Sequence, residues 1–186
     1  GSDTGGSLRN PAAWNNVVGL RPSPGRVPDD DGSWSPLSTS GPMARTVADV
    51  ALFLSAITGH HHPDPISLAD DPAMFRAPLE RSHKGVRVAW FTSMGGIPFE
   101  PEITRVVHAQ RQHFLDLGCI VEDAEPSFDG IDEAFPILRH LTFHANYAKL
   151  AQENPSAFKE TVKWEIAEAE RLRSSDVART TARQAR

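Results

Sequence analysis

The sequence has almost no cysteine: one residue, at position 119, in a chain of 186. A single cysteine excludes an intramolecular disulfide and is typical of a reducing compartment, so we expect a cytoplasmic protein. Its surroundings, Leu117-Gly118-Cys119-Ile120-Val121, indicate the start of a buried strand. We therefore do not expect Cys119 to act as a nucleophile.

Long apolar runs and charge of one sign are lacking too. No run approaches the roughly 20 residues of a membrane span, and no signal-peptide pattern occurs at the start. The chain has 19 Lys and Arg residues against 24 Asp and Glu residues, a formal net charge of −5. This balance disfavours direct nucleic-acid binding and favours small-molecule or protein partners. Length and 39% hydrophobic residues predict one globular domain.

The chemistry of the chain is concentrated at its start, Gly1-Ser2-Asp3-Thr4-Gly5-Gly6-Ser7-Leu8-Arg9-Asn10-Pro11-Ala12. Glycine lacks the Cβ that excludes positive φ, so Gly5-Gly6 can turn consecutive N–H groups toward one point, where an anion would bind. Ser7 would then hold its hydroxyl beside these donors, as acyl transfer requires. A serine hydroxyl also needs a base, and the sequence does not identify one beside Ser7.

Three other motifs share part of this segment. A phosphate loop has the spacing of Gly1 and Gly6, but its lysine is absent and no strand precedes it. Asp3-Thr4-Gly5 resembles the catalytic turn of aspartic proteases, which needs two carboxylates, so a homodimer would have to complete it. The α/β-hydrolase elbow requires glycine two residues after the serine, where this chain has Arg9. The elbow does not fit, and the first two motifs remain alternatives.

Four ordered blocks resemble the amidase signature family. The first twelve residues are similar to its nucleophile segment. Three further stretches are similar to its next blocks, in the same order and with similar spacing: Gly19-Leu20-Arg21-Pro22-Ser23, Gly25-Arg26-Val27-Pro28 and Ser40-Gly41-Pro42-Met43-Ala44-Arg45-Thr46-Val47-Ala48-Asp49. The resemblance is specific over residues 1–59. Beyond residue 59 the sequence agrees with the family mostly in pattern. We expect residues 1–186 to be part of a single amidase signature domain, incomplete at both ends.

The resemblance implies amide hydrolysis by a Ser-Ser-Lys triad that needs no metal or organic cofactor. Ser7 would be the acylating nucleophile, and the backbone N–H groups of Thr4, Gly5, Gly6 and Ser7 would form the oxyanion hole. Ammonia or an amine would leave, and water would release a carboxylic acid. In the family, the bridging serine and the lysine base lie upstream of this motif. We therefore expect negligible activity from residues 1–186 alone.

Asp3 and Arg9 are expected to support the site by pairing across the loop and holding its shape. The alternative for Arg9 is direct contact with a substrate carboxylate, and the alternative for Ser7 is a turn serine that makes local backbone bonds. Two other functions remain open for the chain. It could be a non-catalytic fragment or one half of a split amidase that binds a complementary amidase chain, or a glutaminyl-tRNA-type amidotransferase subunit. The amide substrate is not assigned.

The pattern along the chain predicts an α/β fold, with a mixed central β-sheet flanked by helices. Thr46 and Asp49 form a capping pattern at the start of a helix that ends at Gly59. Residues 85–121 predict a βαβ unit, with one helix beginning at Pro101 and two parallel strands. Residues 131–186 predict a helical region with two helices, at about 131–152 and 156–186.

Two features outside the first block are candidates for a site. His60-His61-His62 lies in a Pro-rich stretch without the i, i+4 spacing of a helical zinc pair, which favours a solvated linker over a metal site. In the amidase signature family, the region that corresponds to residues 131–186 lies near the acyl-binding channel. Phe135, Leu138 and Phe143 are therefore candidate pocket residues by resemblance, with core packing as the alternative.

Overall fold

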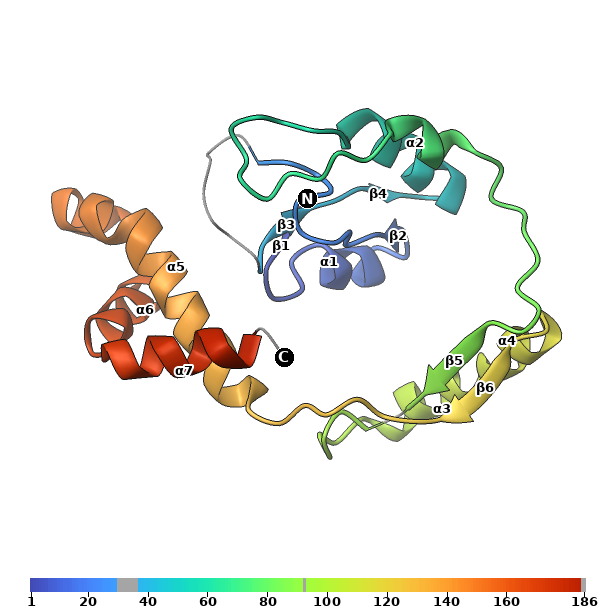
Figure 1. Cartoon of the computed structure of the whole chain (residues 1–186). Coiled ribbons are helices and arrows are strands. Elements are labelled where there is room, and N and C mark those ends of the chain that lie inside the picture. Colours follow the sequence, from blue (N-terminus) through green and yellow to red (C-terminus); the bar gives the residue numbers. More distant parts are fainter. Residues whose placement is uncertain (30–36, 92, 185–186) are drawn as a thin grey trace. The chain divides into compact units, whose positions relative to one another are not determined.

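The computed structural model describes residues 1–29, 37–91 and 93–184. The chain divides into two compact units, Gly1–Arg81 and Ser82–Arg186, whose elements are labelled in Figure 1. Short strands and helices occur in both units, which confirms the α/β class. The boundary falls between the signature blocks and the predicted βαβ unit.

The first unit contains two antiparallel strand pairs. β1 (Ser2–Asp3) pairs with β3 (Thr39–Ser40), and β2 (Val18–Gly19) pairs with β4 (Met43–Ala44). Between β1 and β2 the chain forms the short helix α1 (Arg9–Trp14). The nucleophile segment is therefore anchored on a strand that lies almost 40 residues further along the chain.

Close packing explains a glycine of the last signature block. A Cβ added to Gly41 would lie 2.3 Å from the carbonyl oxygen of Leu20 and 2.9 Å from Leu8 Cδ1. Leu8 is fully buried and Ala12 is 2% exposed, so this contact lies in the core of the first unit. Any larger residue at position 41 would push apart backbone and core side chains.

Helix α2 (Val47–Ile57) begins where the capping pattern predicts. The side-chain oxygen of Thr46 accepts a hydrogen bond from the backbone N–H of Asp49 at 3.1 Å, which satisfies one of the donors at the helix start. Val50 and Leu54 are each 3% exposed, so they form the buried face. The 3₁₀ turn η1 (Pro72–Arg76) packs against this helix.

The predicted βαβ unit is present with parallel strands, β5 (Arg87–Trp90) and β6 (Ile120–Asp123). The single helix predicted between them is wrong, because the chain forms α3 (Pro101–Ala109) and α4 (Arg111–Asp116). At the junction the N–H of Gln110 bonds to the carbonyl three residues back, at 3.0 Å. This tighter turn interrupts the α-helical ladder without breaking the chain direction sharply.

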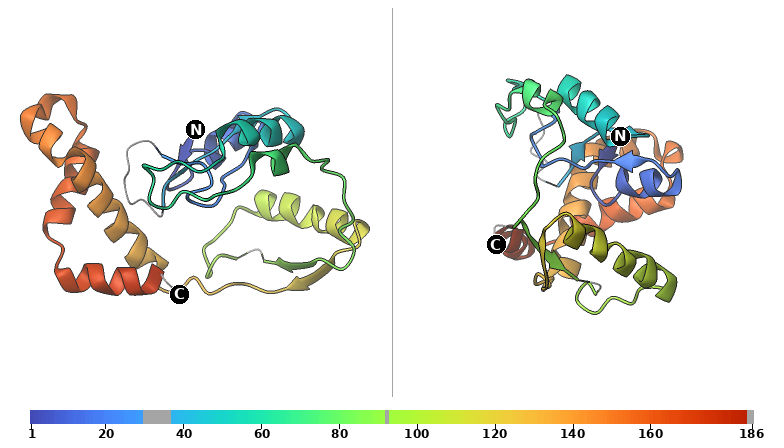
Figure 2. Two further views of the ribbon diagram at one scale, coloured as in Figure 1. Left: turned by 45° about the horizontal axis from the view of Figure 1, so that its top comes forward. Right: turned by 90° about the vertical axis from the view of Figure 1, so that its right-hand side faces the viewer.

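Helices make up the last third of the chain: α5 (Ile131–Glu153), the 3₁₀ turn η2 (Pro155–Ala157), α6 (Glu160–Glu170) and α7 (Ser174–Gln184). Both α6 and α7 pack against α5, as Figures 1 and 2 show. The prediction of one helix over 156–186 is wrong. Asp176 accepts a 2.9 Å hydrogen bond from the N–H of Arg173 and so begins a separate helix.

The predicted mixed sheet is represented by separate strand pairs. The described ranges contain three sheets of two strands each. Two of these sheets are antiparallel, and the third is parallel. Both kinds of pairing expected of a mixed sheet therefore occur. None of the helices in the described part of the chain is long and apolar enough to span a bilayer.

Candidate active site

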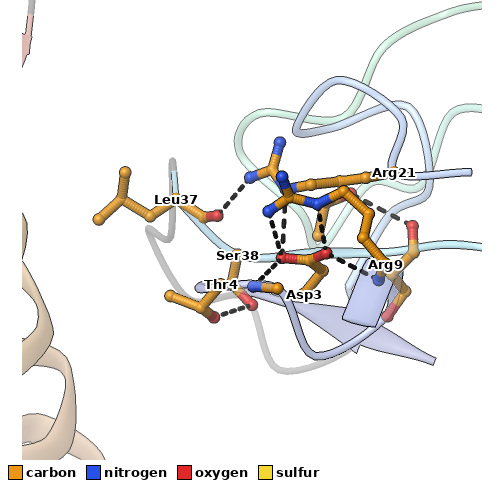
Figure 3. Close-up of polar contacts among 9 residues, drawn as sticks. Asp3, Thr4, Arg9, Arg21, Leu37 and Ser38 are labelled. Atoms are coloured by element: carbon orange, nitrogen blue, oxygen red, sulfur yellow. Dashed lines mark hydrogen bonds and ion pairs between the residues drawn. The ribbon is translucent and has the colours of Figure 1, made fainter. Parts of the chain in front are cut away.

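Asp3 is the centre of the candidate site and is fully buried. Its Oδ1 accepts a hydrogen bond from the N–H of Gly6 at 2.7 Å, and its Oδ2 accepts one from the N–H of Arg9 at 3.4 Å. The Arg9 guanidinium also donates from Nε to Oδ2 at 2.8 Å and from Nη2 to Oδ1 at 3.1 Å (Figure 3). The expected ion pair between Asp3 and Arg9 is present. The Asp3 carboxylate therefore holds both the Gly6 N–H and the Arg9 side chain.

The charge of Asp3 is stabilised by these partners. The hydrogen bond from the Arg9 guanidinium lowers the pKa of Asp3 well below its ordinary value of 3.8. Burial opposes this shift, and the backbone N–H groups of Gly6 and Arg9 reinforce it. In turn, Asp3 raises the pKa of Arg9. A carboxylate held ionised in this way disfavours the aspartic-protease alternative, which needs a shared proton.

Gly6 gives the turn its shape. Its φ of +112° lies in a region that side-chain-bearing residues rarely adopt, and an added Cβ would lie 2.7 Å from Asn10 Nδ2. The carbonyl oxygen of Gly6 accepts a hydrogen bond from the N–H of Asn10 at 2.8 Å. Gly6 is therefore required by the backbone path that leads into α1.

Ser7 directly follows this turn and is exposed in the described structure. Of the four expected oxyanion donors, the N–H of Gly6 already donates to Asp3. The residues of the first unit include no lysine, because the four lysines of the chain stand at positions 84, 149, 159 and 163. The unit that carries Ser7 thus has the candidate nucleophile without a candidate lysine base.

A second arginine, Arg21, lies at this site and was not among the predicted site residues. Arg21 Nε lies 3.6 Å from Asp3 Oδ1, and Arg21 Nη2 donates to the carbonyl oxygen of Leu37 at 2.6 Å. The hydroxyl of Thr4 donates to the hydroxyl oxygen of Ser38 at 3.0 Å, beside this contact (Figure 3). The sequence does show Arg21 in the second signature block. Its partners, Asp3 and Leu37, stand 34 positions apart, so the sequence alone does not indicate that Arg21 joins them.

The candidate pocket residues lie in the second unit. Phe135, Leu138 and Phe143 are half-buried on α5. The Phe143 ring contacts the Arg139 guanidinium, 4.7 Å from the ring centre, and the Tyr147 ring at 5.7 Å between centres. Both contacts join residues four positions apart on one face of α5. A role in substrate binding stays a prediction.

The histidine run adds no metal cluster to this site. Among the residues that the structure describes, no group of three His, Cys, Asp or Glu side chains could hold a metal ion. The backbone N–H of His61 donates to the Ser67 hydroxyl oxygen at 2.8 Å, which ties the run to the chain that follows it.

The described geometry is a glycine turn that leads into Ser7 and is held by the buried Asp3. The chain belongs to the amidase signature family, since the Amidase family model matches residues 1–186. An acylamidase of Rhodococcus erythropolis is 33% identical over 186 residues, which cover 98% of this chain and 39% of that protein. One glutamyl-tRNA(Gln) amidotransferase subunit, from Pseudomonas syringae pv. syringae, is 36% identical over 142 residues, covering 73% of this chain and 28% of that protein.

Solved structures agree with this assignment. The chain matches a bacterial aryl acylamidase of the amidase signature family with a TM-score of 0.84 and 25% identity, over 97% of this chain and 40% of that one. It matches the fold of 6-aminohexanoate cyclic dimer hydrolase with a TM-score of 0.77, at 23% identity and the same coverage. The chain therefore spans about 40% of the length of these relatives.

Proposed function

We propose that this chain carries the nucleophile segment of an amide hydrolase, with Ser7 as the acylating residue. The observation that carries the proposal is the buried Asp3, which holds the Gly6 N–H and the Arg9 guanidinium and so fixes the turn before Ser7. Membership of the amidase signature family supports an amide as the substrate.

The reaction proceeds by acyl transfer in two steps. Ser7 Oγ attacks the amide carbonyl carbon, and the carbonyl oxygen becomes an oxyanion that accepts hydrogen bonds from the N–H groups of Thr4, Gly5 and Ser7. The Gly6 N–H contributes only as a donor shared with Asp3. Each such donor contributes about 3 to 4 kcal/mol. Collapse of the tetrahedral intermediate breaks the carbon–nitrogen bond while the base passes the Ser7 proton to the departing nitrogen, so that ammonia or an amine leaves. The ester left on Ser7 is then hydrolysed by water to the carboxylic acid.

The base that takes the Ser7 proton comes from outside Gly1–Arg81. The family resemblance implies a lysine acting through a bridging serine, and the first unit has no lysine. Members of a catalytic unit are strongly non-additive, so loss of the base removes most of the rate. Residues 1–186 alone would then hydrolyse amides negligibly, and a complementary amidase segment or chain would complete the site.

A second candidate function is that of an amidotransferase subunit. The 36% identity to a glutamyl-tRNA(Gln) amidotransferase subunit favours it, whereas the match to an acylamidase extends over more of this chain. The two candidates differ in the amide that is cleaved, and hydrolysis of free glutamine compared with acyl amides separates them. The single cysteine supports a cytoplasmic location for either candidate.

The test replaces Ser7 in the protein, assembled with any complementary amidase segment or chain that completes the site. We expect Ser7→Ala to lower amide hydrolysis by about 10⁴-fold or more, because the nucleophile acts as part of a unit. Ser2→Ala, at an exposed serine of the same segment, is the matched control and should retain the wild-type rate. A fluorophosphonate adduct should map to Ser7 by mass spectrometry. Hydrolysis by Ser7→Ala at the wild-type rate would overturn the proposal.

A further inference from the structure

We propose that Arg21 is a positioning residue for Ser7, which acts by joining Asp3 to the segment around β3. The inference rests on the proposed function, because the reactivity of Ser7 is its readout. It adds a residue from a different signature block to the site and gives the segment from Leu37 to Ser40 a part in the reaction.

The Arg21 guanidinium links two partners that no other side chain in the close-up joins (Figure 3). Nε lies 3.6 Å from Asp3 Oδ1, and Nη2 donates to the Leu37 carbonyl oxygen at 2.6 Å. The Nε atom is buried and makes no hydrogen bond within the described residues, so the guanidinium meets the Asp3 carboxylate as an ion pair without a hydrogen bond. A shift of Leu37 would therefore be felt at Asp3.

Arg21 is also the better shielded of the two arginines beside Asp3. Its side chain is 26% exposed, whereas that of Arg9 is 55% exposed. Attraction between charges grows as water is excluded, so Arg21 acts on the fully buried carboxylate through a medium of lower dielectric. Arg9 supplies the shorter hydrogen bonds, and Arg21 fixes where the carboxylate lies relative to the rest of the unit.

Two more contacts join the nucleophile segment to the same place. Asp3 lies opposite Thr39 in the β1–β3 pair, and the Thr4 hydroxyl donates to Ser38 Oγ at 3.0 Å. The segment that carries Ser7 is thus held against residues 38–40 by backbone pairing and by a hydroxyl bond. The Arg21 bridge is a third contact, and it differs from these two because it involves the charge of Asp3.

A purely structural ion pair in the same unit provides the matched control. Arg26 Nε donates to Asp70 Oδ2 at 2.7 Å, with the Arg26 side chain 32% exposed. This pair is similar to Arg21 in burial and closer in distance, but it does not touch the nucleophile segment. If Arg21 served only stability, Arg21→Met and Arg26→Met would affect Ser7 equally.

The experiment measures fluorophosphonate labelling of Ser7 in the protein, assembled in the same way, at several probe concentrations. We expect Arg21→Met to lower the maximal labelling rate by about tenfold, because a small misplacement of the nucleophile is costly. The half-saturating concentration should stay within about twofold, since Arg21 does not touch the probe. Arg21→Lys keeps the positive charge but has one ammonium nitrogen in place of the two that face Asp3 and Leu37, so it should restore only part of the rate. Arg26→Met should lower only the melting temperature.

A double variant tests whether Arg21 acts through Asp3. If it does, Asp3→Asn with Arg21→Met labels no more slowly than Asp3→Asn alone, whereas additive losses contradict the route. Should Arg21→Met not fold, Arg21→Gln replaces it, because the glutamine amide can stand where Arg21 Nε lies, beside Asp3, while the charge and the bond to Leu37 are lost. Labelling of the Arg21 variants at the wild-type rate overturns this inference only. Absence of Ser7 labelling in the wild-type protein overturns the proposed function.

Discussion

Replacing Asp3 by asparagine removes the negative charge of the site while keeping the size of the side chain. Asp3 is fully buried, and Arg9 and Arg21 both face it. Removing one partner of a buried ion pair costs about 3 to 5 kcal/mol, because the other charge is left uncompensated. The Arg9 side chain is 55% exposed, so water solvates part of its charge. We therefore expect a loss near the lower end, about 3 kcal/mol.

The loss is measured in the first unit by urea denaturation, with hydrogen exchange of residues 1–29 and 37–81 as the readout at each urea concentration. Asp70→Asn is the control, since it breaks an ion pair whose carboxylate is 22% exposed, whereas the Asp3 carboxylate is fully buried. That change should cost about 1 kcal/mol or less. If Asp3→Asn unfolds at the wild-type urea concentration, the carboxylate does not hold the segment and the reasoning fails.

The same substitution should change the response to acid. The pKa of Asp3 in the folded protein lies below its ordinary value of 3.8, because of the Arg9 guanidinium. The unfolded chain therefore binds a proton at this position before the folded protein does. The stabilisation from Asp3 is complete above pH 3.8 and declines as the pH falls from there toward the lowered pKa. The stability difference between wild type and Asp3→Asn should narrow in that range, and a constant difference would contradict this account.

Two further substitutions test the turn and the second unit. Gly6→Ala forces a Cβ into a backbone with φ of +112° and against Asn10, so we expect a loss of about 2 kcal/mol in the first unit and slower Ser7 labelling. Wild-type stability in urea would show that the backbone path is not required. Glu165→Gln weakens the bonds that Arg139 Nε and His140 Nδ1 make to Glu165, each at 2.6 Å. Its expected cost is about 2 kcal/mol, seen as faster hydrogen exchange in α5 and α6, and unchanged exchange would contradict it.

The sequence was informative wherever neighbouring residues decide the structure. The start of α2 follows from the bond between Thr46 and the Asp49 N–H, three residues apart. The parallel strands β5 and β6 follow from β-branched runs on either side of an amphipathic stretch. In both cases the partners lie within one local pattern, so no distant contact had to be known.

The helix interruptions were not predictable from periodicity. Gln110 keeps helical backbone angles, with φ −78° and ψ −15°, so the apolar spacing continues across the boundary between α3 and α4. Between α6 and α7 the signal was present but overlooked, because Ser174, Ser175 and Asp176 are residues that favour a helix start. Charged residues continue from α6 into α7, and an apolar stripe accompanies them, so the sequence pattern predicted one helix in place of two.

In the candidate site too, some contacts could be predicted from neighbouring residues and others could not. The pairing of Asp3 and Arg9 could be predicted, since six residues separate them. The contact of Arg21 with Leu37 could not, because it depends on how β1 pairs with β3. Nor could the donation of the Gly6 N–H to Asp3, which needs the turn geometry itself.

The nucleophile turn depends on groups that are not contiguous in the chain. The carboxylate of Asp3 is satisfied by groups within its own loop, but Arg21 and the carbonyl of Leu37 complete its surroundings from two other stretches. A transplant of the first ten residues into another scaffold would carry the serine and glycines without these supports. The smallest portable version of this turn is therefore a discontinuous set of three chain segments, which a designer would have to graft together.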